Sequence, residues 1–128
     1  MLVFEFCAEN LTYIDKAIAA GAGRIELCDN LAVGGTTPSI GVINEAIKLT
    51  RAKSVDLCVI IRPRGGDFVY TELEVEAMLA DIRAAKERNR GYLFCAGCAD
   101  ERSKVGPEDH AAFTSSLWRG RGGLSYGL

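Results

Sequence analysis

The sequence lacks a long hydrophobic run, a basic leader and an excess of positive charge. No apolar stretch in its 128 residues approaches the ~20 needed to cross a bilayer. The first five residues read Met-Leu-Val-Phe-Glu, with a carboxylate and no basic residue, so they do not predict a signal peptide. The formal net charge is -2, which gives no reason to expect a nucleic-acid or membrane partner.

Histidine is scarce, whereas cysteine is not. The one histidine, His110, falls in an irregular region, where we expect exposure rather than catalysis. The five cysteines are Cys7, Cys28, Cys58, Cys95 and Cys98. Without an export signal, they favour reduced thiols in the cytoplasm over disulfides. The last two have the CxxC spacing, but the second pair that a zinc site of this type needs is absent.

Short apolar strands alternate with amphipathic segments over the first ninety residues. The expected strands cover residues 2–7, 24–28 and 55–61, with a fourth at 92–95. Apolar residues at helical spacing lie between them, over residues 11–18, 40–47 and 75–82. The short links predict right-handed crossovers and a parallel sheet, hence an α/β fold. A doubly wound sheet and a barrel both satisfy this pattern.

Helix-starting residues precede each helical segment. We expect Asn10 to cap the first helix and Thr37 to cap the second, with Pro38 in its first turn. The apolar spacing places Ile40 on the buried face of that second helix. Residues 71–74 read Thr-Glu-Leu-Glu, which predicts a capping box at the start of the third.

The strand at residues 24–28 alternates ionisable and aliphatic side chains. Arg24, Glu26 and Cys28 share one face, opposite Ile25 and Leu27. Strands of parallel sheets are normally near-continuous apolar runs, so this alternation is unusual. Because the aliphatic face must meet the helices, we expect the polar face to point into a barrel. The same parity on the neighbouring strands adds further inward residues, which are Glu5, Cys7, Cys58 and Arg62.

Ionisable groups inside a barrel are costly unless they are paired. Glu5 and Glu26, with Arg24 and Arg62, can form a carboxylate–guanidinium cluster at the strand ends. Such a cluster serves either a ligand site or a structural ion network, and the residues leave both interpretations open.

The loop at residues 62–67 reads Arg-Pro-Arg-Gly-Gly-Asp. The guanidiniums of Arg62 and Arg64, with Asp67 and a diglycine beside them, suit a planar carboxylate or a phosphate. The alternative is a tight turn whose arginines are solvated. Residues 34–37, Gly-Gly-Thr-Thr, can likewise bind an anion at a helix N-terminus.

Cys7, Cys28 and Cys58 all have the inward parity. Thiolates are the preferred ligands of Cu(I), so the cysteines are candidates for a copper site. A buried cysteine also commonly serves as a small hydrophobic residue, and this alternative stays open.

Long segments of the chain resemble the CutC family pattern. They are residues 24–31, 34–42 and 61–70, with a shorter match in the opening Phe4-Glu5-Phe6-Cys7 and in the helix at 78–82. The resemblance covers residues 1–88 and implies a cytoplasmic TIM-type (β/α) barrel, truncated to about three to four β/α units. It also implies a role in copper homeostasis through binding of Cu(I).

In a CutC-like protein, Cys7 and Cys28 would be the metal-associated thiols. The residues that would line a substrate pocket at the barrel mouth are Glu5, Arg24, Glu26, Arg62, Arg64 and Asp67. The expected ligand is therefore a metal ion or a small anion. The alternative function is a TIM-barrel enzyme that acts on a small anionic substrate.

Residues 89–128 depart from the family pattern. Their glycine- and serine-rich end has no sustained apolar period, which predicts a divergent tail that is either frame-shifted or poorly ordered. A truncated barrel would expose sheet edges and inner apolar surface, so we expect self-association. A non-functional truncated product is the third interpretation of the chain.

Overall fold

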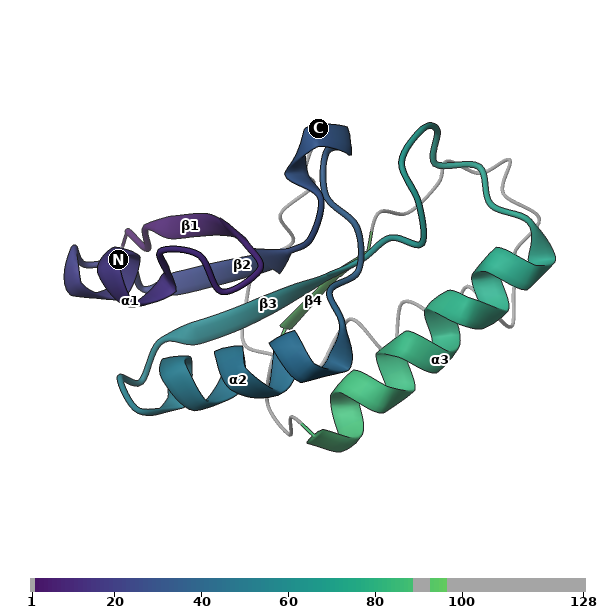
Figure 1. Cartoon of the computed structure of the whole chain (residues 1–128). Coiled ribbons are helices and arrows are strands. Elements are labelled where there is room, and N and C mark those ends of the chain that lie inside the picture. Colours follow the sequence, from purple (N-terminus) through teal and green to yellow (C-terminus); the bar gives the residue numbers. More distant parts are fainter. Residues whose placement is uncertain (1, 89–92, 97–128) are drawn as a thin grey trace.

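Strands and helices alternate along the chain (Figure 1). The computed structural model describes residues 2–88 and 93–96. Its elements are β1 (Glu5–Glu9), α1 (Ile14–Ala19), β2 (Arg24–Cys28), the 3-10 turn η1 (Leu31–Val33), α2 (Ile40–Arg51), β3 (Asp56–Ile61), α3 (Glu72–Arg88) and β4 (Leu93–Ala96). Residues 89–92 and 97–128 of the expected tail, with Cys98 and His110 among them, lie outside the described residues. Within them, no helix is long and apolar enough to cross a membrane.

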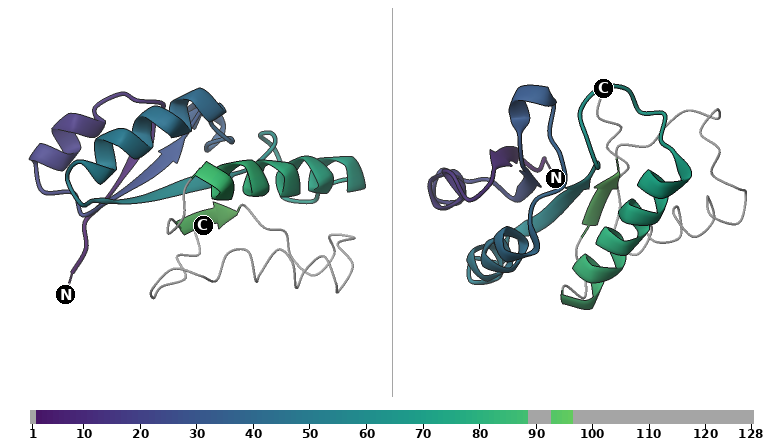
Figure 2. Two further views of the ribbon diagram at one scale, coloured as in Figure 1. Left: turned by 90° about the horizontal axis from the view of Figure 1, so that it is seen from below. Right: turned by 45° about the vertical axis from the view of Figure 1, so that its right-hand side comes forward.

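The four strands form one parallel sheet in the order β1-β2-β3-β4. Figure 2 shows the three helices on the same side of these strands. A doubly wound sheet reverses its strand order and carries helices on both faces, whereas consecutive barrel strands keep their order and their helices outside. The described part of the chain therefore has the barrel arrangement.

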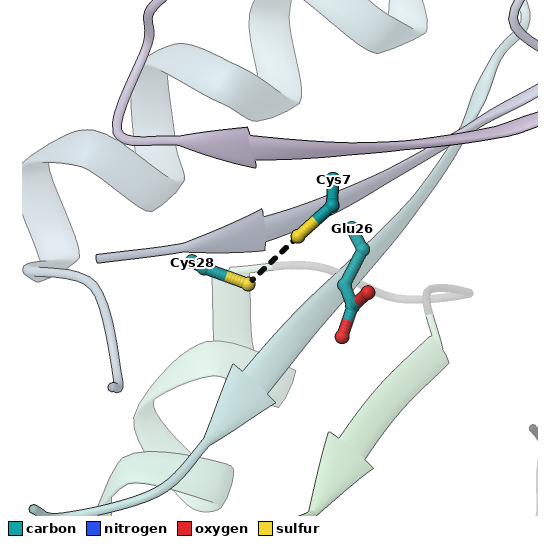
Figure 3. A group of neighbouring side chains, drawn as sticks. All are labelled: Cys7, Glu26 and Cys28. Atoms are coloured by element: carbon teal, nitrogen blue, oxygen red, sulfur yellow. Dashed lines mark hydrogen bonds between the residues drawn. The ribbon is translucent and has the colours of Figure 1, made fainter. Parts of the chain in front are cut away.

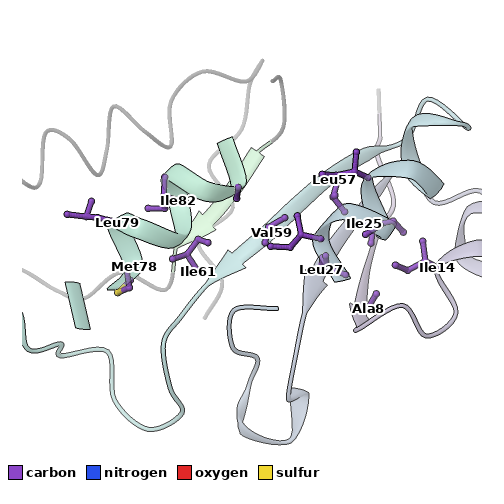
Figure 4. Packing of buried hydrophobic residues seen from close by; sticks show 14 of the residues in the cluster. Ala8, Ile14, Ile25, Leu27, Leu57, Val59, Ile61, Met78, Leu79 and Ile82 are labelled. Atoms are coloured by element: carbon purple, nitrogen blue, oxygen red, sulfur yellow. The ribbon is translucent and has the colours of Figure 1, made fainter. Parts of the chain in front are cut away.

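The aliphatic faces of the strands pack against the helices. Ile25, Leu27, Leu57, Val59 and Ile61 are fully buried in this cluster (Figure 4). The helices contribute Ile14, Ile43, Ala46, Ile47, Met78, Leu79, Ile82 and Ala85. Burial of a large aliphatic side chain contributes about 1.5–3 kcal/mol, so this layer is the main source of stability. The expected division of the strand faces is confirmed.

The start of α3 confirms one capping prediction, and the start of α2 corrects another. The Thr71 N–H donates to Glu74 at 2.8 Å and the Glu74 N–H donates to the Thr71 hydroxyl at 3.3 Å, which is a capping box. The N-cap of α2 is Ser39, which accepts from the Val42 N–H at 3.3 Å. Thr37 does not cap this helix, because its hydroxyl bonds to the backbone of Arg62 instead.

Three further expectations about element boundaries are wrong. The first strand begins at Glu5 and runs to Glu9, because its pairing with β2 begins at Glu5. Asn10 adopts a left-handed conformation with φ 57° and its side chain accepts from the Leu11 N–H, while α1 begins only after Tyr13. Ile40 is 40% exposed, since the buried face of α2 begins one turn later.

Candidate functional site

Two cysteines and a glutamate meet on the open face of the sheet, opposite the helices. Cys7 on β1 pairs in register with Glu26 on β2, and Cys28 follows Glu26 by two residues on the same face. The Sγ atoms of Cys7 and Cys28 are 3.7 Å apart. One ligand atom from each of the three residues lies within 4.8 Å of the others. Figure 3 shows the three side chains. This spacing is compatible with a metal ion.

The three residues differ in their exposure to solvent. Cys28, the last residue of β2, is only 1% exposed, Glu26 is partly buried and Cys7 is exposed. Cys28 ends its strand at the carboxyl edge of the sheet, where parallel α/β folds place their functional groups. The sequence parity predicted that these side chains share a face, and the structure confirms it.

Burial and negative charge oppose ionisation in this group. Partial burial raises the pKa of the Cys7 thiol, and the nearby carboxylates of Glu26 and Glu5 raise it further, against the hydrogen bond with Cys28. Burial likewise raises the pKa of Glu26, and the charge of Glu5 adds to this effect. A bound cation would relieve the repulsion, so the electrostatics of the site favour a cation over an anion.

Glu5 and Arg24 form an ion pair, as the sequence predicted, but they begin β1 and β2 and so lie at the amino edge of the sheet, away from the expected barrel mouth. The Arg24 guanidinium lies 3.4 Å from the Glu5 carboxylate. Both side chains are partly exposed, so the pair stabilises the fold only modestly. The Nε atom of Arg24 is buried and has no hydrogen-bond partner among the described residues.

Arg62 does not join that carboxylate–guanidinium cluster. Its guanidinium donates to three backbone carbonyls, those of Val33 at 2.7 Å, Gly35 at 2.8 Å and Gly66 at 2.9 Å. The residue is 4% exposed and its guanidinium lies 5.0 Å from the ring centroid of Phe68. The loops after β2 and β3 enclose Arg62, and their carbonyls take the place of the expected carboxylates.

Arg64 and Asp67 belong to a separate, internally bonded loop. Arg64 forms an ion pair with Glu74 and a second one, at 3.3 Å, with Asp67, and it donates to the Val69 carbonyl at 2.8 Å. The hydrogen bond from Arg64 lowers the pKa of Glu74, assisted by the Thr71 N–H. Glu74 was predicted only as a capping residue, since nothing local in the sequence reveals its contact with Arg64.

Gly35 is a site residue that the sequence did not single out by itself. It adopts φ +95°, and a β-carbon there would lie 3.2 Å from Ile60 Cδ1 and 3.5 Å from the Sγ of Cys28. The diglycine at residues 34–35 indicates that the backbone comes close to another group. In the structure, one such group beside Gly35 is the Cys28 thiol. Cys58, the third inward cysteine, is 3% exposed and lies outside the three-ligand group.

A family model described as the CutC family matches residues 2–106. The chain belongs to the CutC family. A CutC family protein from Streptococcus pyogenes is 57% identical over 92 residues, which are 72% of this chain and 44% of that protein. The one from Enterococcus faecalis is 57% identical over 100 residues, or 78% and 47% of the two chains. This chain thus spans less than half the length of these CutC relatives.

The likeness extends to mammalian and solved CutC proteins. The mouse copper homeostasis protein cutC homolog is 49% identical over 84 residues, covering 66% of this chain and 30% of that protein. A CutC crystal structure from Streptococcus agalactiae matches with a TM-score of 0.74 and 41% identity, over 94% of this chain and 57% of the other. The expected fold class is confirmed: a parallel TIM-type (β/α) arrangement, with three β/α units and a fourth strand described.

Proposed function

We propose that this CutC chain handles copper in the cytoplasm by binding one Cu(I) ion between Cys7 and Cys28. The observation that carries the proposal is the 3.7 Å separation of the two thiol sulfurs, with the Glu26 carboxylate beside them. The names of the mouse and human relatives, copper homeostasis protein cutC homologs, support the choice of metal. Copper is the cargo of this site.

The donor set suits Cu(I) better than harder cations. Soft thiolates select Cu(I), while carboxylates suit magnesium, calcium or manganese. Thiolate–metal bonds of the length known for zinc, about 2.3 Å, let one ion bridge sulfurs up to about 4.6 Å apart. Cys7 and Cys28 lie within that reach. Glu26, a hard ligand, is better placed to balance charge and accept a thiol proton than to bind copper.

The strand register disfavours a disulfide between these thiols. Cys7 pairs with Glu26, so Cys28 lies diagonally across from Cys7. Ideal strand spacing and rise place the α-carbons of such a diagonal pair about 8 Å apart. Disulfides usually need about 4.4–6.8 Å. The geometry therefore favours two thiols that share an ion over two that oxidise together.

Anaerobic titration with Cu(I) against a chromophoric chelator tests this function. We expect one tightly bound ion per chain, lost when Cys7→Ser and Cys28→Ser are combined. Cys58→Ser is the matched control, because Cys58 lies on the same face but outside the ligand group, and its variant should bind like the wild type. Undiminished binding by the double variant would disprove the proposal.

A second candidate is a TIM-barrel enzyme that acts on a small anionic substrate on the inner face of the sheet. One observation favours it: the buried Nε of Arg24, beside Glu5, has no hydrogen-bond partner among the described residues. Arg62 and Arg64 already donate to protein oxygens, which weakens the case for them as anion ligands. Thermal stabilisation by phosphate or small carboxylates, lost in Arg24→Gln, would support this candidate; no stabilisation by any of them would reject it.

A further inference from the structure

We propose that copper enters this site through Cys7 and passes from there to Cys28, and that it arrives as a Cu(I) complex with a small thiol. Arg62 acts as a positioning residue that holds the loop covering Cys28. The inference rests on the proposed copper function and adds the route and the chemical class of the donor.

The two thiols are unequally accessible although they are neighbours. Cys7 is exposed on β1, one of the two outer strands of the described sheet, whereas Cys28 is 1% exposed. Only 3.7 Å separates their sulfurs. Figure 3 shows the Cys7 sulfur directed toward that of Cys28. A copper complex in solvent therefore meets Cys7 first.

The segment that follows β2 covers Cys28. This cover, residues 29–37, folds back on itself: Asp29 and Thr36 exchange backbone hydrogen bonds of 3.0 and 2.8 Å. The Gly35 N–H donates to the Asn30 carbonyl at 3.2 Å. Gly35 thereby lies against the Cys28 side chain, so closely that a β-carbon would contact the sulfur at 3.5 Å.

Arg62, at the end of β3, fastens this cover to the sheet. Its Nη1 donates to the carbonyls of Val33 and Gly35, both in the cover. Its backbone N–H donates to the Thr37 hydroxyl at 2.8 Å, and its carbonyl accepts from the Thr37 N–H at 2.9 Å. Three residues of the cover are thus tied to one buried residue. Without the guanidinium, the contact of Gly35 with Cys28 loses its main support.

The transfer is a ligand exchange with no change of oxidation state. A complex of Cu(I) with two small thiolates loses one of them as Cys7 sulfur bonds to the ion, and the second as Cys28 bonds. The two protein thiol protons leave on the two departing small thiols. A thiol donor is the natural carrier, because Cu(I) prefers soft sulfur ligands and the cytoplasm keeps thiols reduced.

Rapid mixing with the Cu(I)–glutathione complex tests the route. Cys7→Ser should slow the first copper–protein bond at least about tenfold, because the accessible entering ligand is gone. Cys28→Ser should keep that first step near the wild-type rate and hold copper less tightly. Cys58→Ser should change neither. The route would be overturned if Cys7→Ser took up copper at the wild-type rate, or if Cys28→Ser slowed the first step as much as Cys7→Ser.

Alkylation by iodoacetamide, resolved by mass spectrometry, tests the cover without copper. Cys7 should label at least about tenfold faster than Cys28. Arg62→Met should raise labelling of Cys28 about tenfold, because it removes the hydrogen bonds that close the cover. Arg64→Met, which removes bonds within the neighbouring loop and to Glu74 on α3 but none to the cover, is the matched control and should leave Cys28 protected.

Cys58, buried on β3, reports on the sheet as a whole during this labelling. Faster labelling of Cys28 alone in Arg62→Met supports the proposed role of the cover. An unchanged Cys28 in Arg62→Met, or equal gains at Cys28 and Cys58, would overturn it, since Arg62 would then hold nothing or the entire sheet. If the wild type bound no copper yet kept this labelling order, the copper function would fail and the cover would stand.

Discussion

Glu26 illustrates how the chemistry of this protein is set at the level of single residues. It is an acid on a sheet face, half-buried, with a thiol and a second carboxylate as its neighbours. Burial and the carboxylate of Glu5 disfavour its negative charge, whereas the hydrogen bond with Cys7 favours it. Its ionisation therefore costs stability in the metal-free protein and becomes useful only when a cation is near.

Glu26→Gln should stabilise the metal-free protein near neutral pH. The folded-state pKa of Glu26 is raised above the ordinary 4.5, so its contribution to stability is present below that value and is lost as pH rises through the folded-state pKa. The glutamine does not ionise and avoids this loss. We expect a gain on the order of 1 kcal/mol or less at pH 7, vanishing near pH 4.

Urea unfolding at several pH values measures that difference in unfolding free energy. Glu76→Gln, on the exposed surface of α3, is the matched control and should stay within about 0.5 kcal/mol at every pH. A Glu26→Gln variant that is less stable than the wild type at pH 7 would contradict the electrostatic description of the site.

Copper affinity should rise steeply with pH. The ion binds thiolates, and the pKa of the Cys7 thiol is raised by burial and by the neighbouring carboxylates, so binding must release protons at neutral pH. Release of one proton from each thiol corresponds to up to about a hundredfold in affinity per pH unit. Chelator competition at pH 6, 7 and 8 measures it, and an affinity independent of pH would exclude thiolate ligation.

At the scale of elements, the cover over Cys28 depends on a backbone that only glycine adopts easily. Gly35 has φ +95° and close neighbours, whereas Gly41 lies in α2 with only the Ser39 hydroxyl near, at 4.0 Å. Glycine-to-alanine substitutions at these two positions therefore distinguish an effect on the cover from an effect on the helix.

Gly35→Ala should lower the unfolding free energy by about 1–3 kcal/mol, because alanine is strained at φ +95° and its β-carbon would lie only 3.2 Å from Ile60 Cδ1. Gly41→Ala should raise it by up to about 1 kcal/mol, since alanine favours the helix. Chemical denaturation measures both. Equal effects of the two substitutions would mean that the cover is not closely packed.

The third helix begins with a capping box whose glutamate has a second partner. Thr71→Ala should cost about 1 kcal/mol of unfolding free energy, the usual effect of losing an N-cap. Glu74→Ala should cost more, because Glu74 also receives the Arg64 guanidinium. Glu76→Ala on the same helix is the control. Thermal unfolding would contradict this if Thr71→Ala were the more damaging change.

At the scale of the whole molecule, the described sheet has two outer strands and an apolar margin. Beside β1, Leu2 is 78% and Phe4 67% exposed. A groove of about 510 Å³ adjoins them; it is lined by Phe4, Glu5, Phe6, Lys16, Ala17, Ala20, Gly21 and Ala22. Apolar surface next to an unpaired strand edge promotes association.

We therefore predict that the chain self-associates in solution. Light scattering after size exclusion should give a mass above that of one chain at micromolar concentration. Phe4→Lys should reduce association, because it places a charge at the margin of β1, whereas Lys53→Glu, in the turn after α2, should not. A monomer at all concentrations would contradict the prediction.

Local periodicity was enough to predict much of this protein. Neighbours in the sequence predict the alternation of strands and helices and the shared face of Glu5, Cys7, Glu26 and Cys28. The resemblance to the CutC family comes separately, from the motifs at residues 24–31, 34–42 and 61–70. Strand pairing preserves parity, so two thiols predicted on one face do meet there.

The tertiary structure alone decided which partners the arginines find and how exposed each thiol is. Arg62 bonds to Val33 and Gly35, nearly thirty residues earlier, and the same loop buries Cys28 while Cys7 stays exposed. Such contacts depend on how loops after different strands fold over one another. No periodic pattern encodes that path, because hydrogen bonds to backbone carbonyls place no demand on the side chains of the residues that supply them.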